Sequence, residues 1–185
     1  MRVKRFRAWR PAGEYVEEVA SVPYDVVDRG QAIALAEGKP NSFLHVVRAE
    51  IDLPEVEDLY ADIVYKTATA NLNRLMNEGI LIREEEGALY LYSQRMEDHI
   101  QYGIVAGCHV EDYEKGDIKI HEKPRRAKEE DRIRYVDSQN ANTGPVFLAY
   151  RDSVVINEQV EATKRTSPLY HFTADDGIEH TVWKF

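Results

Sequence analysis

The amino-acid sequence predicts an α+β fold, with a mostly antiparallel sheet whose hairpins are packed by three to four helices. Three observations predict this class: one long stretch of helical periodicity, two β-favouring stretches around a short turn, and an Asp-Gly turn between two further apolar stretches. Because helices are interleaved with hairpins along the chain, the strands are expected to pair mostly as antiparallel neighbours. The stretches are residues 58–77, residues 88–96 with 100–110, and residues 169–173 with 178–185.

In the first 50 residues, short strands alternate with one helix. Pro23 restricts the residue before it to extended geometry and is expected to end the second strand. Asp28 is expected to cap a helix that runs through Ala36 and stops at Gly38. A compact apolar stretch then predicts a buried strand. The predicted segments are strands at 6–9 and 19–22, the helix after Asp28, and the strand at 42–47.

The most regular helix is predicted over residues 58–77, and Gly79 stands where a glycine commonly ends a helix. The apolar face of this helix needs a partner surface. We expect that partner to be the hairpin at 88–110, the nearest long apolar surface. The apolar residues at helical spacing are Ala61, Val64, Tyr65, Ala68, Leu72, Leu75 and Met76.

The rest of the chain continues the mixture of strands and helices. Pro124 is expected to open a charged helix that ends near Gln139, because proline is favoured at the first helical position. Cys108 lies in an apolar stretch and is expected to be a packed core thiol. The other predicted elements are a strand at 80–82, the hairpin strands 88–96 and 100–110, a strand at 145–150, a helix at 154–164, and strands 169–173 and 178–185 around the turn 174–177.

The sequence shows no internal repeat and no linker, which predicts a single domain over residues 1–185. The chain ends inside a predicted strand, so we expect it to be the N-terminal portion of a longer protein. A cut at that point is expected to leave an unpaired strand edge or an apolar patch where the missing half docks, and exposed strand edges recruit partners. A homodimer through this edge is therefore expected.

Composition and charge exclude several classes of protein. The chain has 185 residues, 43% of them hydrophobic, and a net charge of −9. It has no apolar run long enough to cross a membrane and no signal-peptide pattern, so a cytoplasmic location is expected. Its single cysteine excludes an intrachain disulfide and any CxxC motif. An acidic protein repels the phosphodiester backbone, so no nucleic-acid partner and no membrane partner is expected.

Two basic clusters stand out against the acidic background. Residues 1–10 carry five basic residues and no acid, and residues 119–134 carry seven bases against four acids. Clusters of this size suit a small anionic ligand better than a duplex. The alternative is that both are solvated surface, with each base paired to a nearby acid.

The second cluster contains the main candidate site. Lys128 and Arg132 are one helical turn apart, and Ile133 and Val136 on the next ridge are expected to face the core. This pattern places Lys128 and Arg132 at the edge of the buried surface, near a helix N-terminus that favours phosphate or carboxylate. A solvated charged face is the alternative. The candidate anion-binding residues are His121, Lys128, Arg132, Asn142 and Thr143.

Other polar segments are ambiguous. Asn142 and Thr143 follow the charged helix, where they line a polar pocket or form an ordinary helix-ending turn. Tyr24, Asp25 and His45 pose the same alternatives and are secondary candidates. None of the six histidines has metal-site spacing, so no metal site is expected. The chain has no GxSxG, Walker or GxGxxG motif.

Several ordered motifs resemble one family over nearly the whole chain. They are Trp9-Arg10-Pro11, Val22-Pro23-Tyr24-Asp25-Val26, Asn41-Ser42-Phe43-Leu44-His45-Val46, Ile51-Asp52-Leu53-Pro54, His121-Glu122, Lys128-Glu129, Asp131-Arg132, Asn140-Ala141-Asn142-Thr143 and Pro145-Val146-Phe147-Leu148. The chain resembles the bacterial and archaeal family catalogued as domain of unknown function 1015. It departs from the family at Pro124, where members often have threonine, and at Tyr135, where many have histidine.

The resemblance implies a longer protein. The second half of the family carries an Asp-Gly-His-His-Arg signature similar to the ParB and sulfiredoxin superfamily, which includes free-serine kinases. This chain has only Asp176-Gly177-Ile178 and ends at Phe185. The resemblance therefore implies a small-molecule phosphotransferase or phosphohydrolase of the ParB-like kind, of which this chain supplies an anion-binding wall. The isolated chain is expected to be inactive.

Phosphoryl transfer depends on positioning and charge neutralisation, so Lys128 and Arg132 are expected to contact phosphate. Glu122 or Asp131 is the candidate to orient a nucleophile or a magnesium ion. ATP or ADP with magnesium is the expected cofactor of the full-length protein, and none is expected in this chain. The alternative function is a non-catalytic metabolite-binding or regulatory module. A winged-helix-like nucleic-acid binder is a third interpretation, against which the net charge of −9 counts.

Overall fold

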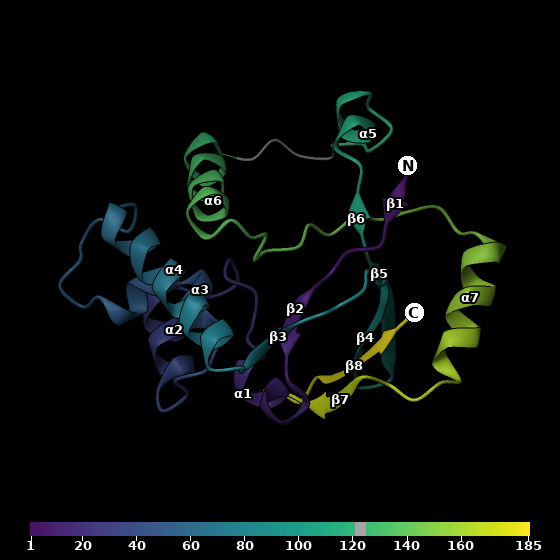
Figure 1. Ribbon diagram of the computed structural model, residues 1–185, viewed down its shortest axis with the longest axis horizontal. Helices are drawn as coiled ribbons and strands as arrows, with labels where there is room; N and C mark the ends of the chain where they lie inside the picture. Colours follow the sequence, from purple (N-terminus) through teal and green to yellow (C-terminus); the bar gives the residue numbers. More distant parts are fainter. Residues whose placement is uncertain (121–124) are drawn as a thin grey trace. The chain divides into compact units, whose positions relative to one another are not determined.

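The computed structural model describes residues 1–120 and 125–185 and divides the chain into two compact units (Figure 1). Unit 1 contains Met1–Gly13, Arg83–His121 and Leu148–Phe185, and unit 2 contains Glu14–Ile82 and Glu122–Phe147. The predicted α+β class is confirmed, because antiparallel strands and helices both form large parts of the chain. A single domain over residues 1–185 stays a prediction. No helix of the described residues has the length and apolar character that crossing a membrane requires.

Unit 1 is built on a four-stranded antiparallel sheet with the strand order β5-β4-β8-β7. Tyr90 of β4 faces Val105 of β5 on one side and Lys184 of β8 on the other. The last strand, β8, is thus paired on both sides, and the predicted exposed C-terminal strand edge is wrong. The edge strands are β5 and β7. The bounds are β4 Tyr90–Met96, β5 His99–Val105, β7 Tyr170–Thr173 and β8 Glu179–Lys184.

The two faces of this sheet have different coverings, because side chains alternate along each strand. Leu91 and Trp183 pack with Val160 of helix α7, Val154–Lys164, which matches the predicted helix. On the opposite face, Tyr90 contacts Phe6, whose backbone forms a bridge with Ala88. The N-terminal segment thus covers part of the second face.

Short elements complete unit 1. Strand β1, Val3–Lys4, pairs with β6, Gly107–Cys108, and is followed by β2, Trp9–Pro11. The predicted long strand 100–110 is therefore two strands, followed by helix α5, Val110–Glu114. Cys108 is exposed, so the predicted core thiol is wrong. The reason is that β6 is a two-residue strand outside the main sheet.

Unit 2 is helical. Two predicted strands, 19–22 and 42–47, are wrong: Val19 ends helix α1, and 44–47 form α3. Short apolar stretches do not distinguish a strand from a buried helix, and helical neighbours decide the outcome here. The elements are η1 Gly13–Tyr15, α1 Val16–Val19, α2 Arg29–Ala36, α3 Leu44–Val47, η2 Ala49–Asp52, α4 Asp62–Asn77 and α6 Arg126–Gln139.

Local sequence signals explain the helix ends. The Asp28 side chain accepts a hydrogen bond from the amide of Gln31, and the Gln31 side chain accepts one from the amide of Asp28, which forms the capping box of α2. After α4, Gly79 has a φ of +73°, a conformation that glycine adopts without strain. Both predicted helix ends are confirmed.

Helix α4 buries the predicted apolar stripe, but against helices rather than the hairpin. Leu72 and Leu75 pack with Val19 and Val46 in one core cluster. Further along α4, its other buried residues pack with Ala49 of η2 and with α6 in a second cluster. The predicted packing on the 88–110 hairpin is therefore wrong, because the residues around α1, α3 and η2 supply a nearer apolar surface. The residues of the second cluster are Ala49, Val64, Tyr65, Ala68 and Tyr135.

Two further strand predictions have different outcomes. Strand β3, Leu81–Arg83, lies one residue later than the predicted 80–82. The predicted strand at 145–150 is wrong, because this segment has no regular secondary structure. Val146 and Phe147 are 79% and 77% exposed, so they do not provide the buried face that the prediction required.

Candidate functional site

Helix α6 holds Arg132 in a stack between two tyrosines. The guanidinium carbon lies 4.1 Å from the ring centroid of Tyr24 and 4.1 Å from that of Tyr135. Nε and Nη2 of Arg132 both donate to Oδ2 of Asp131, at 3.1 and 2.6 Å. The two rings and the carboxylate restrict the rotamers of Arg132, whose side chain is still 29% exposed.

Asp131 links this stack to helix α4. Its Oδ1 accepts a hydrogen bond of 2.8 Å from the hydroxyl of Tyr65, and both residues are buried. Burial, followed by the hydrogen bond to Asp131, raises the pKa of Tyr65 well above its usual value, so the hydroxyl stays a donor. Burial also raises the pKa of Tyr135 to about 12, and its ring meets that of Tyr65 edge-on at 5.0 Å.

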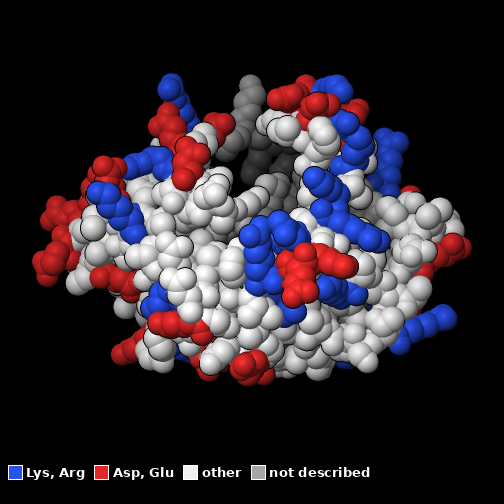
Figure 2. Space-filling view, viewed as in Figure 1, with Lys and Arg blue, Asp and Glu red and all other residues white. Residues whose placement is uncertain are grey.

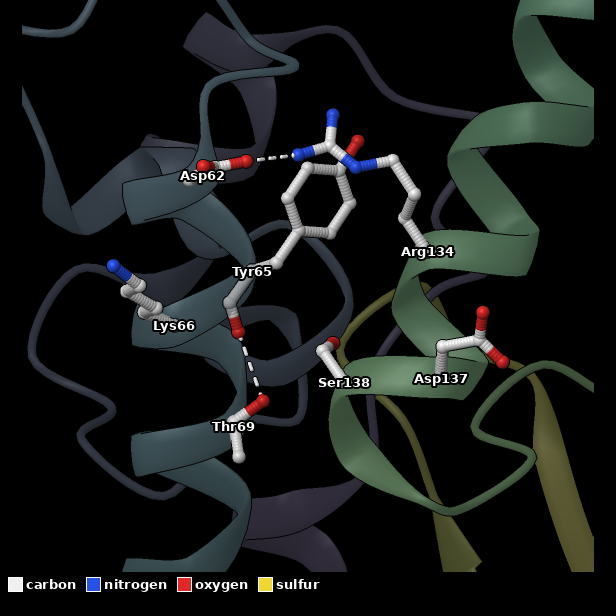
Figure 3. A pocket seen from close by; sticks show the side chains of 7 residues that line it. All are labelled: Asp62, Tyr65, Lys66, Thr69, Arg134, Asp137 and Ser138. Carbon is white, nitrogen blue, oxygen red and sulfur yellow. Dashed lines mark hydrogen bonds and ion pairs between the residues drawn. The ribbon is translucent and has the colours of Figure 1, made fainter.

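A groove lies between α4 and α6 (Figure 3). Its volume is about 560 Å³, within the range of small-molecule sites. The hydroxyls of Thr69 and Ser138 donate to backbone carbonyls of their own helices, at 2.9 and 3.1 Å, and keep lone pairs free to accept. The lining residues are Asp62, Tyr65, Lys66, Thr69, Arg134, Asp137 and Ser138.

Two cations and two acids border the groove. Arg134 lies over the Tyr65 ring, 4.0 Å from its centroid, and donates to the carbonyl of Tyr60 and to Asp62. Lys66 and Asp137 stand on opposite sides of the drawn site, on α4 and α6 (Figure 3). Within the described part of the chain, neither Lys66 nor Asp137 has a recorded ion pair or hydrogen bond. The groove therefore offers one positive and one negative charge for a ligand.

The structure agrees only in part with the predicted placement of Lys128 and Arg132 at the edge of the buried surface. Lys128 is exposed, and neither it nor Arg132 is in the groove wall. Ile133 and Val136 are 53% and 44% exposed, so the prediction that they face the core is wrong. The buried stripe of α6 is polar and aromatic instead, because Tyr65 and backbone carbonyls supply its partners. That stripe consists of Asp131, Tyr135 and Gln139.

The surface favours local charge pairing. Figure 2 shows basic and acidic side chains next to one another at several places on the face in view. On α6, Arg126 pairs with Glu130 at 2.8 Å in an exposed i,i+4 pair. This arrangement agrees with the solvated-face alternative for the N-terminal turn of α6.

The polar segment after α6 ends the helix. The backbone of Asn140 has the left-handed helical conformation, with a φ of 48°. The Thr143 hydroxyl donates to Oε1 of Gln139 at 2.9 Å. Oδ1 of Asn142 accepts from the amide of Gly144 at 3.3 Å. Both candidate residues, Asn142 and Thr143, thus take part in an ordinary turn.

The remaining candidates are dispersed. Tyr24 belongs to the arginine stack, whereas Asp25 is exposed. The predictions for His121 and Glu122, and the helix start at Pro124, fall on 121–124, outside the described residues. No group of three or more metal-ligating side chains occurs within residues 1–120 and 125–185.

His45 is engaged in an ion pair with Asp52, and its carbonyl accepts from Asn71 of α4. Its Nδ1 lies 2.7 Å from Oδ1 of Asp52, and Nε2 lies 3.2 Å from the carbonyl oxygen of Lys39. Asn71 donates to Oδ2 of Asp52 at 2.8 Å. The hydrogen bond to Asp52 raises the pKa of His45, although burial opposes it. Burial alone would raise the pKa of Asp52, but its hydrogen bonds with His45 and Asn71 bring it below the usual value.

This pair predicts a pH dependence of stability. The raised pKa of His45 means that its contribution is fully present below about pH 6.5 and is lost as pH rises through the folded-state pKa. We expect the free energy of unfolding, measured by urea denaturation, to fall above about pH 6.5. The variant His45→Gln should reduce this fall. An unchanged pH profile in the variant would contradict the assignment to His45.

The groove residues Lys66, Tyr65 and Arg134 were not predicted as site residues from the sequence. Lys66 and Thr69 are three residues apart in the predicted helix, and this spacing places both polar side chains along the border of its apolar face. Arg134 was visible as a base in the charged helix. Nothing in the sequence shows that α6 packs beside α4, since Tyr65 and Asp131 are 66 positions apart.

The fold and the site define an α+β protein with a polar, two-helix groove braced by a tyrosine–arginine stack. The chain belongs to the family described as protein of unknown function (DUF1015), whose model matches residues 3–185. Comparison with curated proteins and with solved structures found no match.

Proposed function

We propose that unit 2 binds a small anionic metabolite or nucleotide in the groove between α4 and α6. The observation that carries this proposal is the pairing of a groove of about 560 Å³ with Lys66, a cation on its border that has no recorded partner among the described residues. An ammonium group in this position is free to contact phosphate or carboxylate. Arg134, on α6, adds a second cation to the lining of the groove.

The site is partly preorganised for binding. Arg134 is held against Tyr65, and Tyr65 is held by Asp131. A side chain that is already ordered loses less conformational entropy when the ligand binds. Arg132 lies outside the groove wall and supports this arrangement through Asp131, so we assign it a positioning function in place of the expected contact with phosphate.

The charged side chains around the groove favour a ligand that has both hydrogen-bond acceptors and hydrogen-bond donors. A purely anionic molecule would meet Asp137 at the border opposite Lys66. A nucleotide has phosphates for Lys66 and Arg134, and sugar or base donors for Asp137. ADP or ATP with magnesium is therefore the ligand class that we propose for the full-length protein, in a cytoplasmic setting where nucleotides are abundant.

Within a longer protein, we propose that this unit forms the anion-binding wall of a ParB-like phosphotransferase or phosphohydrolase. A non-catalytic regulatory module is the second candidate, and one observation favours it. Of the two catalytic candidates, Asp131 is the one that lies within the described residues. Both of its carboxylate oxygens already accept hydrogen bonds, from Arg132 and Tyr65. Turnover of ATP or ADP with serine by the full-length protein would distinguish the two.

The binding proposal is tested by isothermal titration of the chain with ADP. Lys66→Ala should weaken binding about tenfold, because a charge-assisted hydrogen bond contributes about 1.5–3 kcal/mol. Lys128→Ala is the matched control: it removes one exposed lysine from α6 outside the groove wall. Equal losses in both variants, or loss only in Lys128→Ala, would contradict the groove as the site.

A further inference from the structure

Strand β5 is an edge of the sheet in unit 1 and lacks the features that usually protect such an edge. Proteins commonly block an exposed strand edge with charged side chains, proline, a bulge or a very short strand. The seven residues of β5 include no lysine, arginine, aspartate, glutamate or proline. They pair one-to-one with the residues of β4, so β5 has no bulge. The other edge strand, β7, has only four residues.

Half of the backbone groups of β5 point away from the sheet. Leu89 and Phe185 exchange two backbone hydrogen bonds, so the odd-numbered residues of β4 bond to β8. The even-numbered residues of β4 therefore bond to β5, where each faces an odd-numbered residue, as Tyr92 faces Gly103. The N–H and C=O groups of the even-numbered residues of β5 point outward. These residues are Ile100, Tyr102 and Ile104.

These outward groups are available to another strand. The backbone hydrogen bonds recorded among the described residues leave them without a partner. Strand β1 does not cover them, because it pairs further along the chain, with β6. The side chain of Ile100 is 42% exposed, so this end of the edge is open to solvent. A strand added here would satisfy a row of backbone donors and acceptors.

The sequence of this edge complements itself when two copies run antiparallel. With Tyr102 opposite the partner's Tyr102, Ile100 faces the partner's Ile104, and Gln101 faces the partner's Gly103. In this register every outward N–H and C=O of both copies finds a partner. Apolar side chains face apolar ones and no like charges are opposed, which favours cross-strand pairing. A two-fold contact requires this kind of self-complementary surface.

The charged group nearest to Tyr102 does not oppose the pairing. Nζ of Lys164 lies 4.6 Å from the centroid of the Tyr102 ring and donates to Oε1 of Glu161 at 2.7 Å. This ion pair balances the lysine charge within its own chain. Two copies that meet at Tyr102 therefore bring together balanced pairs rather than single cations.

We propose that the chain forms a homodimer through β5, in which the two strands pair antiparallel about a two-fold axis at Tyr102. The two sheets then form one continuous sheet, whose remaining edges are the short β7 strands. The contact closes, since each copy uses the same edge. This edge differs from the C-terminal one expected from the sequence, because β8 is an inner strand. The interface involves unit 1 alone and is independent of the groove in unit 2.

Hydrogen exchange of the unaltered chain, measured by NMR at several protein concentrations, tests the proposal. The outward amides of Tyr102 and Ile104 should exchange at least about tenfold more slowly in the dimer than after dilution to the monomer. The amides of Gln101 and Gly103 donate to β4 and should be protected at every concentration. The proposal is overturned if the chain sediments as a monomer throughout, or if dimerisation leaves the exchange of the outward amides unchanged.

Two substitutions of Ile100 test the edge by different means. Ile100→Pro removes an outward N–H and leaves the hydrogen bonds to β4 in place, a position at which edge strands accept proline. The dissociation constant from analytical ultracentrifugation should rise at least about tenfold, since the two-fold axis removes the hydrogen bond twice. Ile100→Lys keeps the N–H and adds the charge typical of a protected edge, and it should also favour the monomer.

Thr173→Pro is the matched control. Thr173 lies on the other edge strand and faces Glu179, an odd-numbered residue of β8 whose backbone bonds to β4. Its own N–H therefore points outward, as that of Ile100 does. This variant should dimerise as the unaltered chain does, and far-ultraviolet circular dichroism checks that all three variants are folded. A dimer that both Ile100 variants leave intact, or that Thr173→Pro weakens equally, would exclude β5 as the interface.

Discussion

Replacing Asp131 by alanine is expected to lower the free energy of unfolding by about 3 kcal/mol, the low end of the range for breaking a buried ion pair. The side chain of Asp131 is 8% exposed and joins two elements of unit 2. Its removal leaves the hydroxyl of Tyr65 buried without an acceptor, and leaves Arg132 stacked without its carboxylate. Urea denaturation monitored by far-ultraviolet circular dichroism measures the change.

Asp137→Ala provides the matched control. Asp137 is an acid of the same helix, but it is exposed and has no recorded partner within the described residues. Its loss should change the stability by less than about 0.5 kcal/mol. Similar losses in the two variants would show that the network of Asp131, Arg132 and Tyr65 does not stabilise unit 2.

Replacing Glu84 by alanine is expected to destabilise unit 1 by about 2–3 kcal/mol, somewhat less than for a fully buried pair. Glu84 is buried and accepts from both Arg10 and Lys184, so alanine leaves two cations without a counter-charge. The smaller value reflects the partial exposure of Arg10 and Lys184, whose side chains are 20% and 40% exposed. Urea denaturation followed by tryptophan fluorescence reports this change, because Trp183 lies in the sheet of unit 1.

The contribution of Glu84 to the free energy of unfolding is expected to decrease at acidic pH. The hydrogen bond from Lys184 lowers the pKa of Glu84, and that from Arg10 adds to it, while burial opposes both. The stabilisation is therefore present above the unfolded-state pKa of about 4.3 and is lost as pH falls through the folded-state value. Glu85→Ala, an exposed neighbour, should leave both the stability and its acid dependence unchanged. An equal effect in Glu85→Ala would contradict the assignment to Glu84.

Long periodic segments were predictable from sequence, and short apolar segments were not. Helix α4 extends over 16 residues, enough for its apolar stripe to repeat several times. The 42–47 stretch is too short to show a period, and the amide of Arg48 donates to the carbonyl of Leu44 in a helical turn. The β7–β8 hairpin was identified from its Asp-Gly turn, and the β4–β5 hairpin from two β-favouring stretches on either side of a short turn.

The candidate site was predictable only in part, because its contacts join distant segments. Arg132 was identified from its charge and spacing, but its stacking on Tyr24 depends on how α6 packs in unit 2. The buried stripe of α6 contains an acid and an amide, so the usual rule that apolar residues face the core selected Ile133 and Val136 instead. A polar interior stripe is recognisable only when its partners, such as Tyr65, are known.

A crystal structure of the chain with bound ADP would test ligand binding in the groove most directly. We expect a phosphate within hydrogen-bond distance of the Lys66 ammonium or the Arg134 guanidinium, in the groove between α4 and α6. Phosphate bound instead beside Lys128 on the outer face of α6, with the groove empty, would contradict it.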